Sequence, residues 1–380
     1  APNAAAAYSL RSLTGGDPQV VRVRRSSNNG EQDFTAAGIS SGALTSFVNE
    51  IQTLGTVTNS VGNDGFTLTN KSSTGFTATT DTATGVCGWP YTAESGDKIT
   101  VSFDAVVRSG TPQFIPRKAT ALSGSNLVDV VSDSAISVNS TASYSFEFTY
   151  DSDEAGSLTF SEGDDNADFD ISNFKVTSFK GAGLVETWYD QSGNSNDAVQ
   201  ATAGSQPKIV SAGSLISKGL DFDGTDDFLQ LDAALGATNA QSIFGVVELD
   251  ALDGSTELIL DNRDGSGDGS AYFAASNEFR YLFDSNSPLA QLSASTDTSL
   301  VSAFKTSSVV AIGIDGGTID TASNTDTLSV TTAPRIGSRS FSSGALFFAG
   351  EIAELVLYST DKSADRTAVE TNINSHYSIY

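Results

Sequence analysis

The chain has 380 residues, of which 46 are Asp or Glu and 20 are Lys or Arg, giving a formal net charge of −26. This charge excludes nucleic-acid binding by phosphate neutralisation, which needs clustered cations, and it disfavours contact with an anionic membrane surface. It suits a protein that stays soluble in saline surroundings, where salt screens the repulsion between like charges.

The counts of rare residues restrict the chain further. Cys87 is the only cysteine, so no intrachain disulfide can form, and stability must come from packing, metals or partners. Met is absent even at position 1, which indicates a processed chain or a part of a longer product. No apolar run approaches the roughly 18 residues of a transmembrane helix, so we expect no membrane insertion. The run at residues 4–7 is too short for a signal-peptide core.

The N-terminal residues predict two helices separated by a strand. Residues 1–13 repeat apolar side chains at helical spacing before Gly15. Residues 20–24 alternate Val with Arg, which is typical of a strand. A second helix is expected within residues 41–54, where apolar side chains share one face and Gly55 is placed to end it.

The strand at residues 20–24 carries the only basic cluster of the chain, Arg22, Arg24 and Arg25. In a chain this acidic, we interpret these side chains as partners for internal carboxylates. The alternative is a contact site for an acidic ligand.

From about residue 56 to residue 180 the composition shifts to Ser and Thr. Residues 99–103 and 144–148 alternate apolar and polar side chains, and residues 169–176 form a closing strand. Short strands separated by frequent turns predict a β-sandwich. Because the sequence on both sides continues one pattern, we expect residues 56–180 to be an inserted domain. Residues 1–55 and 181–380 would then form a second, discontinuous domain.

The remainder of the chain predicts more strands and one helix. Strands are expected near residues 206–210, 219–229, 243–249, 257–260, 271–274, 279–283, 309–314 and 346–358. A terminal helix over residues 364–376 has Ser363 placed to cap it and Val369, Ile373 and Tyr377 as its buried stripe. The predicted fold class is therefore all-β, with two β-sandwich (jelly-roll) domains, one inserted in the other, and a few short peripheral helices.

Residues 188–197 read WYDQSGNSND and combine two large aromatic side chains with a polar turn. Gly supplies positive φ, and Asn and Asp side chains bond their own backbone, so this run turns at the end of a strand. Such turns often carry ligand contacts. The candidate carbohydrate-binding residues here are Trp188, Tyr189, Asp190, Gln191 and Asn194. The alternative is a structural corner, in which Trp188 fills the core and Asp190 caps the turn.

A second pair of candidates lies in the insert. A sugar site needs exposed aromatic rings that stack on a pyranose face beside Asn, Asp or Gln side chains. Trp89 and Tyr91 belong to the loop-like segment Gly88-Trp89-Pro90-Tyr91 and meet this requirement. Alternatively, Trp89 closes the core of the insert.

Calcium is the metal that the composition favours, because oxygen ligands are plentiful while one Cys and one His cannot build a zinc site. Residues 261–269, DNRDGSGDG, resemble a carboxylate-and-glycine calcium loop in which Asp261, Asp264 and Asp268 are the candidate ligands. The run lacks the regular EF-hand pattern, so a solvated hairpin loop is the alternative. Residues 223–227, DGTDD, are interpreted as a tight turn. No cofactor is required.

Several motifs, taken together, resemble known families. AAYSLRSL, VVRVRRSSNNGEQDF and WYDQSGNSNDAVQ with QPKIV resemble the β-sandwich module of the arabinofuranosidase B family. Similar modules occur in tail and other structural proteins of marine bacteriophages. GLDFDGTDDFLQL and GEIAELVLYSTDKSADR resemble the opening and closing strands of concanavalin-like, laminin-G-type jelly rolls. GDKITVSFDA and DFDISNFKVT, inside the insert, resemble a carbohydrate-binding module.

The resemblance also implies where a hydrolase would carry its two catalytic carboxylates. In arabinofuranosidases the acid/base Asp follows Ile-Gly-Gly, whereas here Ile336-Gly337-Ser338 is followed by Arg339. The nucleophile Glu would lie a few residues beyond Asp261, where this chain has the run RDGS from Arg263. The paired cysteines of that active site are missing. His376, the only histidine, lies near the end of the terminal helix and is interpreted as a surface or cap residue, so no Ser-His-Asp triad is expected.

We therefore expect no catalytic residues and a non-catalytic, lectin-like surface protein of a phage virion, such as a tail-fibre or head-decoration component. Its partners would be other virion proteins and glycans or the host cell surface, contacted weakly and in many copies, as a homo-oligomer or in an assembly. Its location would be the virion or the extracellular space. The alternatives are a secreted glycoside hydrolase of arabinofuranosidase type and a structural shell protein that binds no sugar.

Overall fold

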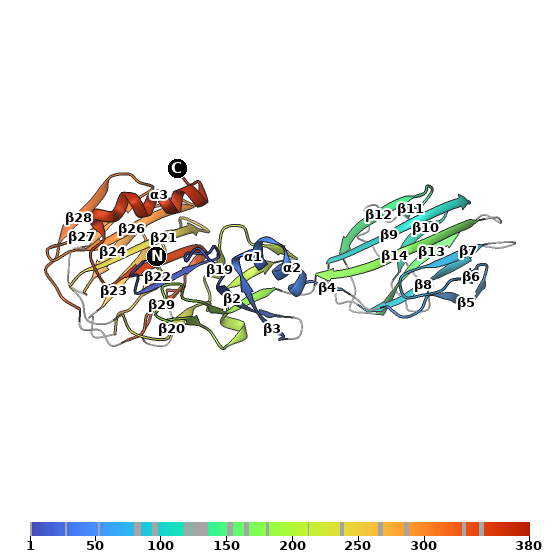
Figure 1. Ribbon diagram of the computed structural model, residues 1–380, viewed down its shortest axis with the longest axis horizontal. Helices are drawn as coiled ribbons and strands as arrows, with labels where there is room; N and C mark the ends of the chain where they lie inside the picture. Colours follow the sequence, from blue (N-terminus) through green and yellow to red (C-terminus); the bar gives the residue numbers. More distant parts are fainter. Residues whose placement is uncertain are drawn as a thin grey trace. The chain divides into compact units, whose positions relative to one another are not determined.

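The computed structural model divides into two compact units, residues 1–47 with 181–380, and residues 48–180 (Figure 1). Most described elements are strands, which confirms the predicted all-β fold class. The first boundary lies between Phe47 and Val48 rather than at residue 55, because strand β4 (Glu50–Ile51) already pairs with a strand of the insert. The structure describes residues 2–26, 29–51, 54–79, 85–92, 98–117, 122, 136–149, 155–162, 167–179, 182–211, 213–235, 239–264, 269–284, 289–328, 332–341 and 346–380.

The insert is a sandwich of two antiparallel sheets. One sheet has the strand order β11-β10-β13-β8-β5, and the other has the order β12-β9-β14-β7-β6, with β4 beside β14. The remaining bounds are β5 (Thr58–Asp64), β6 (Thr67–Thr69), β7 (Phe76–Thr79), β8 (Gly85–Thr92), β9 (Lys98–Ser109), β10 (Gln113–Arg117), β11 (Ile136–Ser137), β12 (Ala142–Thr149), β13 (Ala155–Glu162) and β14 (Asp168–Phe179).

Aromatic side chains fill the space between these two sheets. Trp89 of β8 stacks on Phe174 of β14 with ring centroids 4.0 Å apart, and Phe103, Phe114 and Phe160 pack around this pair. The insert thus has a hydrophobic core of its own.

The discontinuous unit contains the other elements. Before the insert these are β1 (Ala6–Ser9), β2 (Gln19–Arg25), β3 (Glu31–Thr35), α1 (Ala36–Ser40) and α2 (Ala43–Val48), the last residue of which begins the insert. After it come β15 (Gly183–Trp188), β16 (Ala198–Val199), η1 (Ala203–Ser205), β17 (Lys208–Ser211), β18 (Ser214–Leu215), β19 (Leu220–Asp223), β20 (Leu229–Leu231), β21 (Gln241–Leu249), β22 (Glu257–Asp261), β23 (Ser270–Ala275), β24 (Glu278–Phe283), β25 (Ala290–Ser293), β26 (Ser299–Lys305), β27 (Val309–Ile314), β28 (Ile319–Ser323), β29 (Arg335–Ile336), β30 (Ala349–Tyr358), η2 (Ser363–Asp365) and α3 (Arg366–Tyr377).

Strand β30 connects the two ends of this unit. Its whole length pairs with β21 on one side, while its other side pairs first with β19 and then with β1. The strands β19 and β20, expected as neighbours around a tight turn, pair with other strands instead: β19 with β17 and β30, β20 with β16 and β29. The turn between them therefore leads from the strands that pair with β19 to the strands that pair with β20.

Helix α3 covers the outer face of the sheet that contains β21, β26 and β30 (Figure 1). Because the helix lies on one face and the core on the other, nearly every residue of these strands is buried. The helix begins at Arg366, and Ser363 belongs to the preceding 3-10 turn rather than forming the expected cap. Within the described residues, none of the helices has the length and apolarity that crossing a membrane requires.

The predicted helix over residues 1–13 is wrong. Ala6 to Ser9 form strand β1, whose residues are all buried and pair with Glu354 to Leu357 of β30. Alanine has a high helix propensity, but a free edge of β30 offers more burial, and tertiary context overrides propensity. The second predicted helix is shorter than expected: α2 ends at Val48, and a separate helix α1 precedes it, capped by Thr35.

The basic cluster has internal partners, as interpreted from the sequence. Arg22 and Arg24 of β2 form ion pairs with Asp33 and Glu31 of β3 at 2.7 and 2.8 Å. The Arg25 guanidinium lies 4.5 Å from the centre of the Phe47 ring. The cluster therefore joins β2 to β3 and to α2.

Because each unit has its own core, we predict that each can be weakened without the other. Trp89→Ala removes the central ring of the insert and should destabilise it by about 3–5 kcal/mol. Hydrogen exchange followed by mass spectrometry should then show faster exchange in peptides from 48–180, with 181–380 unchanged. Trp188→Ala should give the reverse pattern. Equal acceleration in both units by either variant would contradict two independent cores.

Candidate functional site

Trp188 ends strand β15 and lies in the core. Its side chain is 0% exposed and packs against the Tyr8 ring with centroids 5.6 Å apart. A ring that stacks on a sugar needs one face open to solvent, and this ring has none. The sugar-stacking prediction for Trp188 is therefore wrong, and the alternative interpretation, a ring that fills the core, describes its position.

Asp190 organises the turn that follows. Its carboxylate accepts hydrogen bonds from the backbone N–H groups of Ala7, Ser192 and Asn196, at 2.8, 2.8 and 3.0 Å. The Ser192 hydroxyl donates a further bond of 2.7 Å. Tyr189, beside it, donates its hydroxyl proton to Asp33 at 2.7 Å. These side chains cap and hold a corner of the fold.

Gln191 and Asn194 hold the N-terminal segment. The Gln191 side-chain N–H group donates to the carbonyls of Ser9 and Arg11, at 2.9 and 3.0 Å, and its oxygen accepts from the Leu13 N–H at 2.8 Å. The Asn194 amide donates to the carbonyls of Ala4 and Ala5. Both side chains thus donate to backbone carbonyls of the N-terminal segment, and a role in sugar binding stays a prediction.

Trp89 and Tyr91 lie in strand β8 rather than in a loop. Trp89 is 0% exposed and Tyr91 is 3% exposed, because both rings point between the sheets of the insert. These two rings have no open face for a pyranose either, so the sequence prediction that they stack on sugar is wrong. The alternating burial of a sandwich strand explains their position.

A groove of about 560 Å³ lies between the N-terminal segment, β30 and α3. Its floor is apolar: Val356, Tyr358 and Ile373 are buried members of the cluster under α3. Its rim is polar, with Asn3 and Arg11 on the N-terminal side and Lys362, Asp365 and Asn372 on the side of η2 and α3. An apolar floor with a few convergent polar groups is the usual composition of a small-molecule site.

An ion pair with one buried partner forms one end of the groove. Arg11 Nε and Nη2 donate to the two carboxylate oxygens of Glu354 at 2.7 and 2.9 Å, and Nη2 also donates to Asn372 Oδ1 at 3.1 Å. Glu354, 1% exposed, accepts a further bond from the Ser9 hydroxyl at 2.9 Å. Burial alone would lower the pKa of Arg11, but the hydrogen bond and charge of Glu354 raise it. Arg11 is therefore held as a fixed cation.

The other side of the rim is neutral overall. Lys362 Nζ lies 3.1 Å from an Asp365 oxygen and 5.5 Å from the centre of the Tyr358 ring. Burial raises the pKa of the Tyr358 hydroxyl, which keeps it protonated at neutral pH. Both cations of the rim thus have carboxylate partners, so the groove presents hydrogen-bonding groups without a net charge.

A second hollow of about 590 Å³ lies on the other side of the N-terminal segment. It is mostly apolar, with Leu10, Ile39 and Leu215 in its lining. His376 also borders it and is exposed on the last turn of α3, as its interpretation as a surface residue requires. Partial burial of the imidazole and, next, the charge of the nearby Arg11 lower its pKa, so this histidine is mainly neutral at pH 7. The first groove has the more polar surface of the two.

Asp261, the first candidate ligand of the predicted calcium loop, is not free to bind an ion. Asp261 is 0% exposed, and one oxygen pairs with Arg263 Nε at 2.5 Å while the other accepts from Ser340 N and Oγ at 2.8 and 3.0 Å. Both of its oxygens are therefore engaged inside the protein, which contradicts a role as a calcium ligand. Asp264 is exposed, and Asp268 lies outside the described residues.

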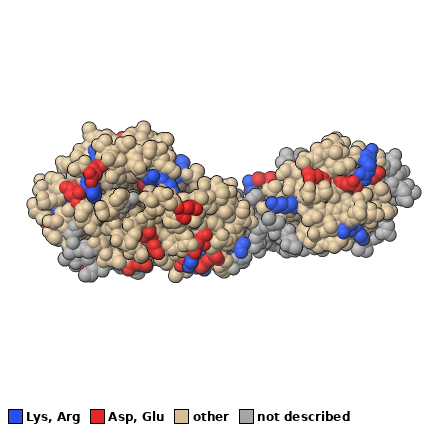
Figure 2. Space-filling model, in the orientation of Figure 1, with Lys and Arg blue, Asp and Glu red and all other residues tan. Residues whose placement is uncertain are grey.

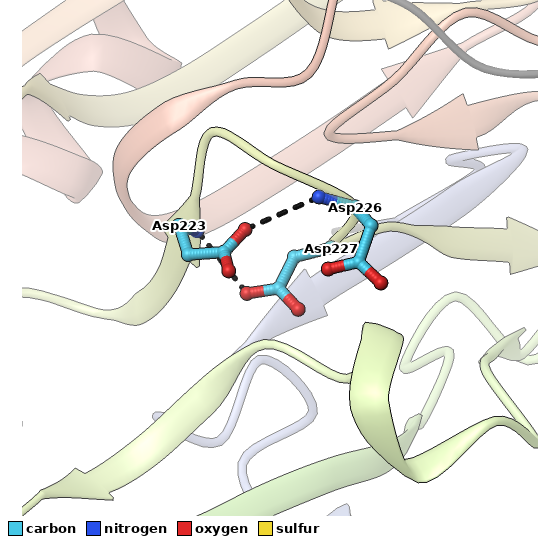
Figure 3. A group of neighbouring side chains, drawn as sticks. All are labelled: Asp223, Asp226 and Asp227. Carbon is cyan, nitrogen blue, oxygen red and sulfur yellow. Dashed lines mark hydrogen bonds between the residues drawn. The ribbon is translucent and has the colours of Figure 1, made fainter.

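Within the described part of the chain, three carboxylates gather at one place: those of Asp223, Asp226 and Asp227 have oxygens within 4.8 Å of one another (Figure 3). They surround the turn after β19, as the sequence predicted for residues 223–227. Asp223 Oδ1 accepts from Thr225 N at 2.8 Å, and Asp227 Oδ2 accepts from Asp223 N at 3.1 Å. These bonds account for the cluster as a turn, and calcium stays a prediction of the composition.

Charged side chains of both signs lie on the surface. In the view of Figure 2, basic and acidic side chains are interspersed, and no broad basic face is seen there.

The sequence matches no protein-family model and no curated protein. Among solved structures, the botulinum neurotoxin serotype D binding domain has a TM-score of 0.37 at 12% identity, over 51% of this chain and 49% of that one. Trypanosoma rangeli sialidase in complex with sialic acid has 0.36 at 13%, over 80% and 59%. Mouse laminin alpha1 domains LG4-5 have 0.30 at 10%, over 73% and 86%. Similarities this low carry no argument about what this chain does.

The buried carboxyl in the turn after β19 yields a prediction about stability and pH. Desolvation, followed by the charge of Asp223, raises the pKa of Asp227 to about 7. A folded-state pKa above the unfolded value stabilises the protein below the unfolded pKa, and this contribution is lost as the pH rises through about 7. Asp227→Asn should therefore increase the free energy of unfolding at pH 8 by about 2 kcal/mol, and by less at pH 5.

Urea denaturation at pH 5 and pH 8 measures this difference, and Asp232→Asn, an exposed carboxylate, is the matched control. A loss of stability in Asp227→Asn that is equal at both pH values would show that the carboxylate supports the turn in its charged form.

Proposed function

We propose that this chain is a non-catalytic, glycan-binding β-sandwich protein and that the groove between the N-terminal segment and α3 is its sugar site. The observation that carries the proposal is the composition of this groove, an apolar floor under a neutral, hydrogen-bonding rim. Sugars present C–H faces and hydroxyl groups together, so they bind where apolar side chains and amides lie side by side.

The rim and floor suggest how a sugar would lie. The amides of Asn3 and Asn372 can each donate to and accept from hydroxyl groups. The apolar side chains of Leu13, Val356 and Val369 would receive the C–H face. Arg11 remains fixed by Glu354, so it can offer a donor without changing its position.

The contacts of Asp261 support a non-catalytic role over the glycoside hydrolase alternative. At the place where the resemblance puts the catalytic carboxylates, Asp261 is paired with Arg263 and bonded to Ser340, and Arg339 follows Ile336-Gly337-Ser338. A retaining mechanism needs one carboxylate free to attack and one free to donate a proton. The described residues at this place do not supply that pair.

The biological setting is proposed from the resemblance alone. The chain would belong to the outer surface of a phage virion, as a tail-fibre or head-decoration component present in many copies. A shallow groove binds a single sugar weakly, and repeated copies convert weak contacts into firm attachment. Glycans of the host surface and other virion proteins would be its partners.

Ala368 allows a direct test of the groove, because it is exposed on α3 and lines the groove. Ala368→Trp should fill the groove and weaken glycan binding at least about tenfold. Thr371→Trp places the same ring on the same helix outside the groove and should leave binding unchanged. A glycan array identifies the ligand, and isothermal titration with that glycan compares the variants.

If Ala368→Trp and the wild type bound the glycan with equal affinity, the sugar site would have to lie outside this groove. No binding to any glycan would favour the structural shell protein. Release of nitrophenol from a chromogenic arabinofuranoside would favour the hydrolase.

A further inference from the structure

We propose a second binding site, for a small oxyanion, formed by Arg263 and Arg339 beside the Phe341 ring and by Arg335, which bonds to the Arg339 carbonyl. It is separate from the groove under α3 and does not depend on glycan binding there. The ligand would be a carboxylate, sulfate or phosphate group. The chain contains only 20 basic residues against 46 acidic ones, so three arginines in one place form a local excess of positive charge.

Strand register brings these residues together. Arg335 of β29 lies opposite Gln230 of β20 on one side and opposite Asp261 of β22 on the other. Directly opposite residues of an antiparallel pair share one face of the sheet. Arg263 follows Asp261 by two residues, and Arg339 follows the turn after β29, where its carbonyl accepts a bond from Arg335 Nη1 at 3.2 Å.

The site has more positive than negative charge. Arg263 pairs with Asp261 at 2.5 Å. Arg335 donates to the Gln230 side-chain oxygen at 2.8 Å and lies 4.5 Å from the centre of the Phe228 ring. Among the described residues no carboxylate forms a direct ion pair with it, although the charge of Asp261 acts on it across the strand pair. Arg339 also has no carboxylate partner there. One carboxylate thus serves three guanidinium groups.

Arg339 is the residue that points to a ligand. Its Nε is buried and has no hydrogen-bond partner among the described residues, while its guanidinium lies 5.2 Å from the centre of the Phe341 ring. The Arg263 guanidinium lies 5.6 Å from the same ring. A buried donor without a partner costs free energy that a bound acceptor would recover.

The donor chemistry selects the ligand class. Guanidinium groups present pairs of N–H donors that match the two oxygens of a carboxylate or sulfate. The partly buried Arg335 and Arg339, supported by aromatic rings, are pre-organised, which reduces the ordering cost of binding. The surrounding charge of −26 would repel an extended polyanion, so a single small oxyanion fits this site better than nucleic acid.

The test uses the full chain labelled with 15N-arginine and follows the Nε–Hε signals during titration with sodium sulfate, at ionic strength held constant with sodium chloride. In the wild type we expect saturable shifts in the Arg339 Nε–Hε signal, which the Arg339→Gln spectrum identifies by its loss. In Arg339→Gln the titration is followed through the Arg335 Nε–Hε signal, and the apparent affinity for sulfate should be at least about tenfold weaker. Arg280→Gln removes a guanidinium already paired with Glu278 and should leave the affinity unchanged.

Parallel titrations with glucuronate and glucose separate the sources of the oxyanion. Saturation by glucuronate but not glucose assigns the site to an acidic sugar, whereas saturation by sulfate alone assigns it to an inorganic ion; both support the site. Arg339→Lys keeps the charge and provides a folded variant if Arg339→Gln is unstable, and it should also weaken binding. Shifts that never saturate, or that are equal in the wild type and the Arg339 variant, would overturn the proposal.

Discussion

Glu354 is a buried carboxylate in β30, the strand that joins the two ends of the discontinuous unit. Because it is buried, its charge must be balanced by hydrogen-bonding and charged partners. A buried charge without a partner costs several kcal/mol, and here Arg11, Ser9 and Tyr377 contact it. These partners come from the N-terminal segment and from α3. One ion pair therefore ties the first residues of the chain, the sheet and the terminal helix together, and it also sets the end wall of the groove.

The polar turn after β15 supports the same arrangement from the other side. Gln191 and Asn194 bind backbone groups of residues 4–13, and Asp190 binds Ala7. The N-terminal segment is thus held on one side by side-chain amides and on the other by Glu354. Because a single cysteine cannot form an intrachain disulfide, these hydrogen bonds hold the N-terminal segment in place at the side of the groove. The polar groups of the rim keep their positions only if the backbone that carries them is fixed, and these hydrogen bonds fix it.

The sequence predicted the fold class and most strands of the second half, because alternation and turn residues are local signals. It missed β26, where SLVSAFK is buried on both faces and therefore shows no clean alternation. It also predicted a helix at residues 1–13, since local spacing cannot reveal that β30 offers a free edge there.

The site was harder to predict. Trp188 and Trp89 look the same whether they fill a core or face a ligand, and only the packing of the sheets decides this. The groove is formed by residues 2–15, 354–358 and 362–373, which no single motif joins. The Arg339 departure from the family pattern was visible in the sequence, but the sequence could not show that its buried Nε has no hydrogen-bond partner among the described residues.

We propose that the groove between the N-terminal segment and α3 binds a glycan and leaves it intact. Methyl-labelled protein titrated with the glycan, and followed by NMR over hours, tests both parts in one sample. We expect shifts confined to the methyl groups of Leu13, Val356, Val369 and Ile373, and anomeric proton signals of the sugar that stay unchanged. Shifts located in the insert, or new anomeric signals of a cleaved product, would contradict it.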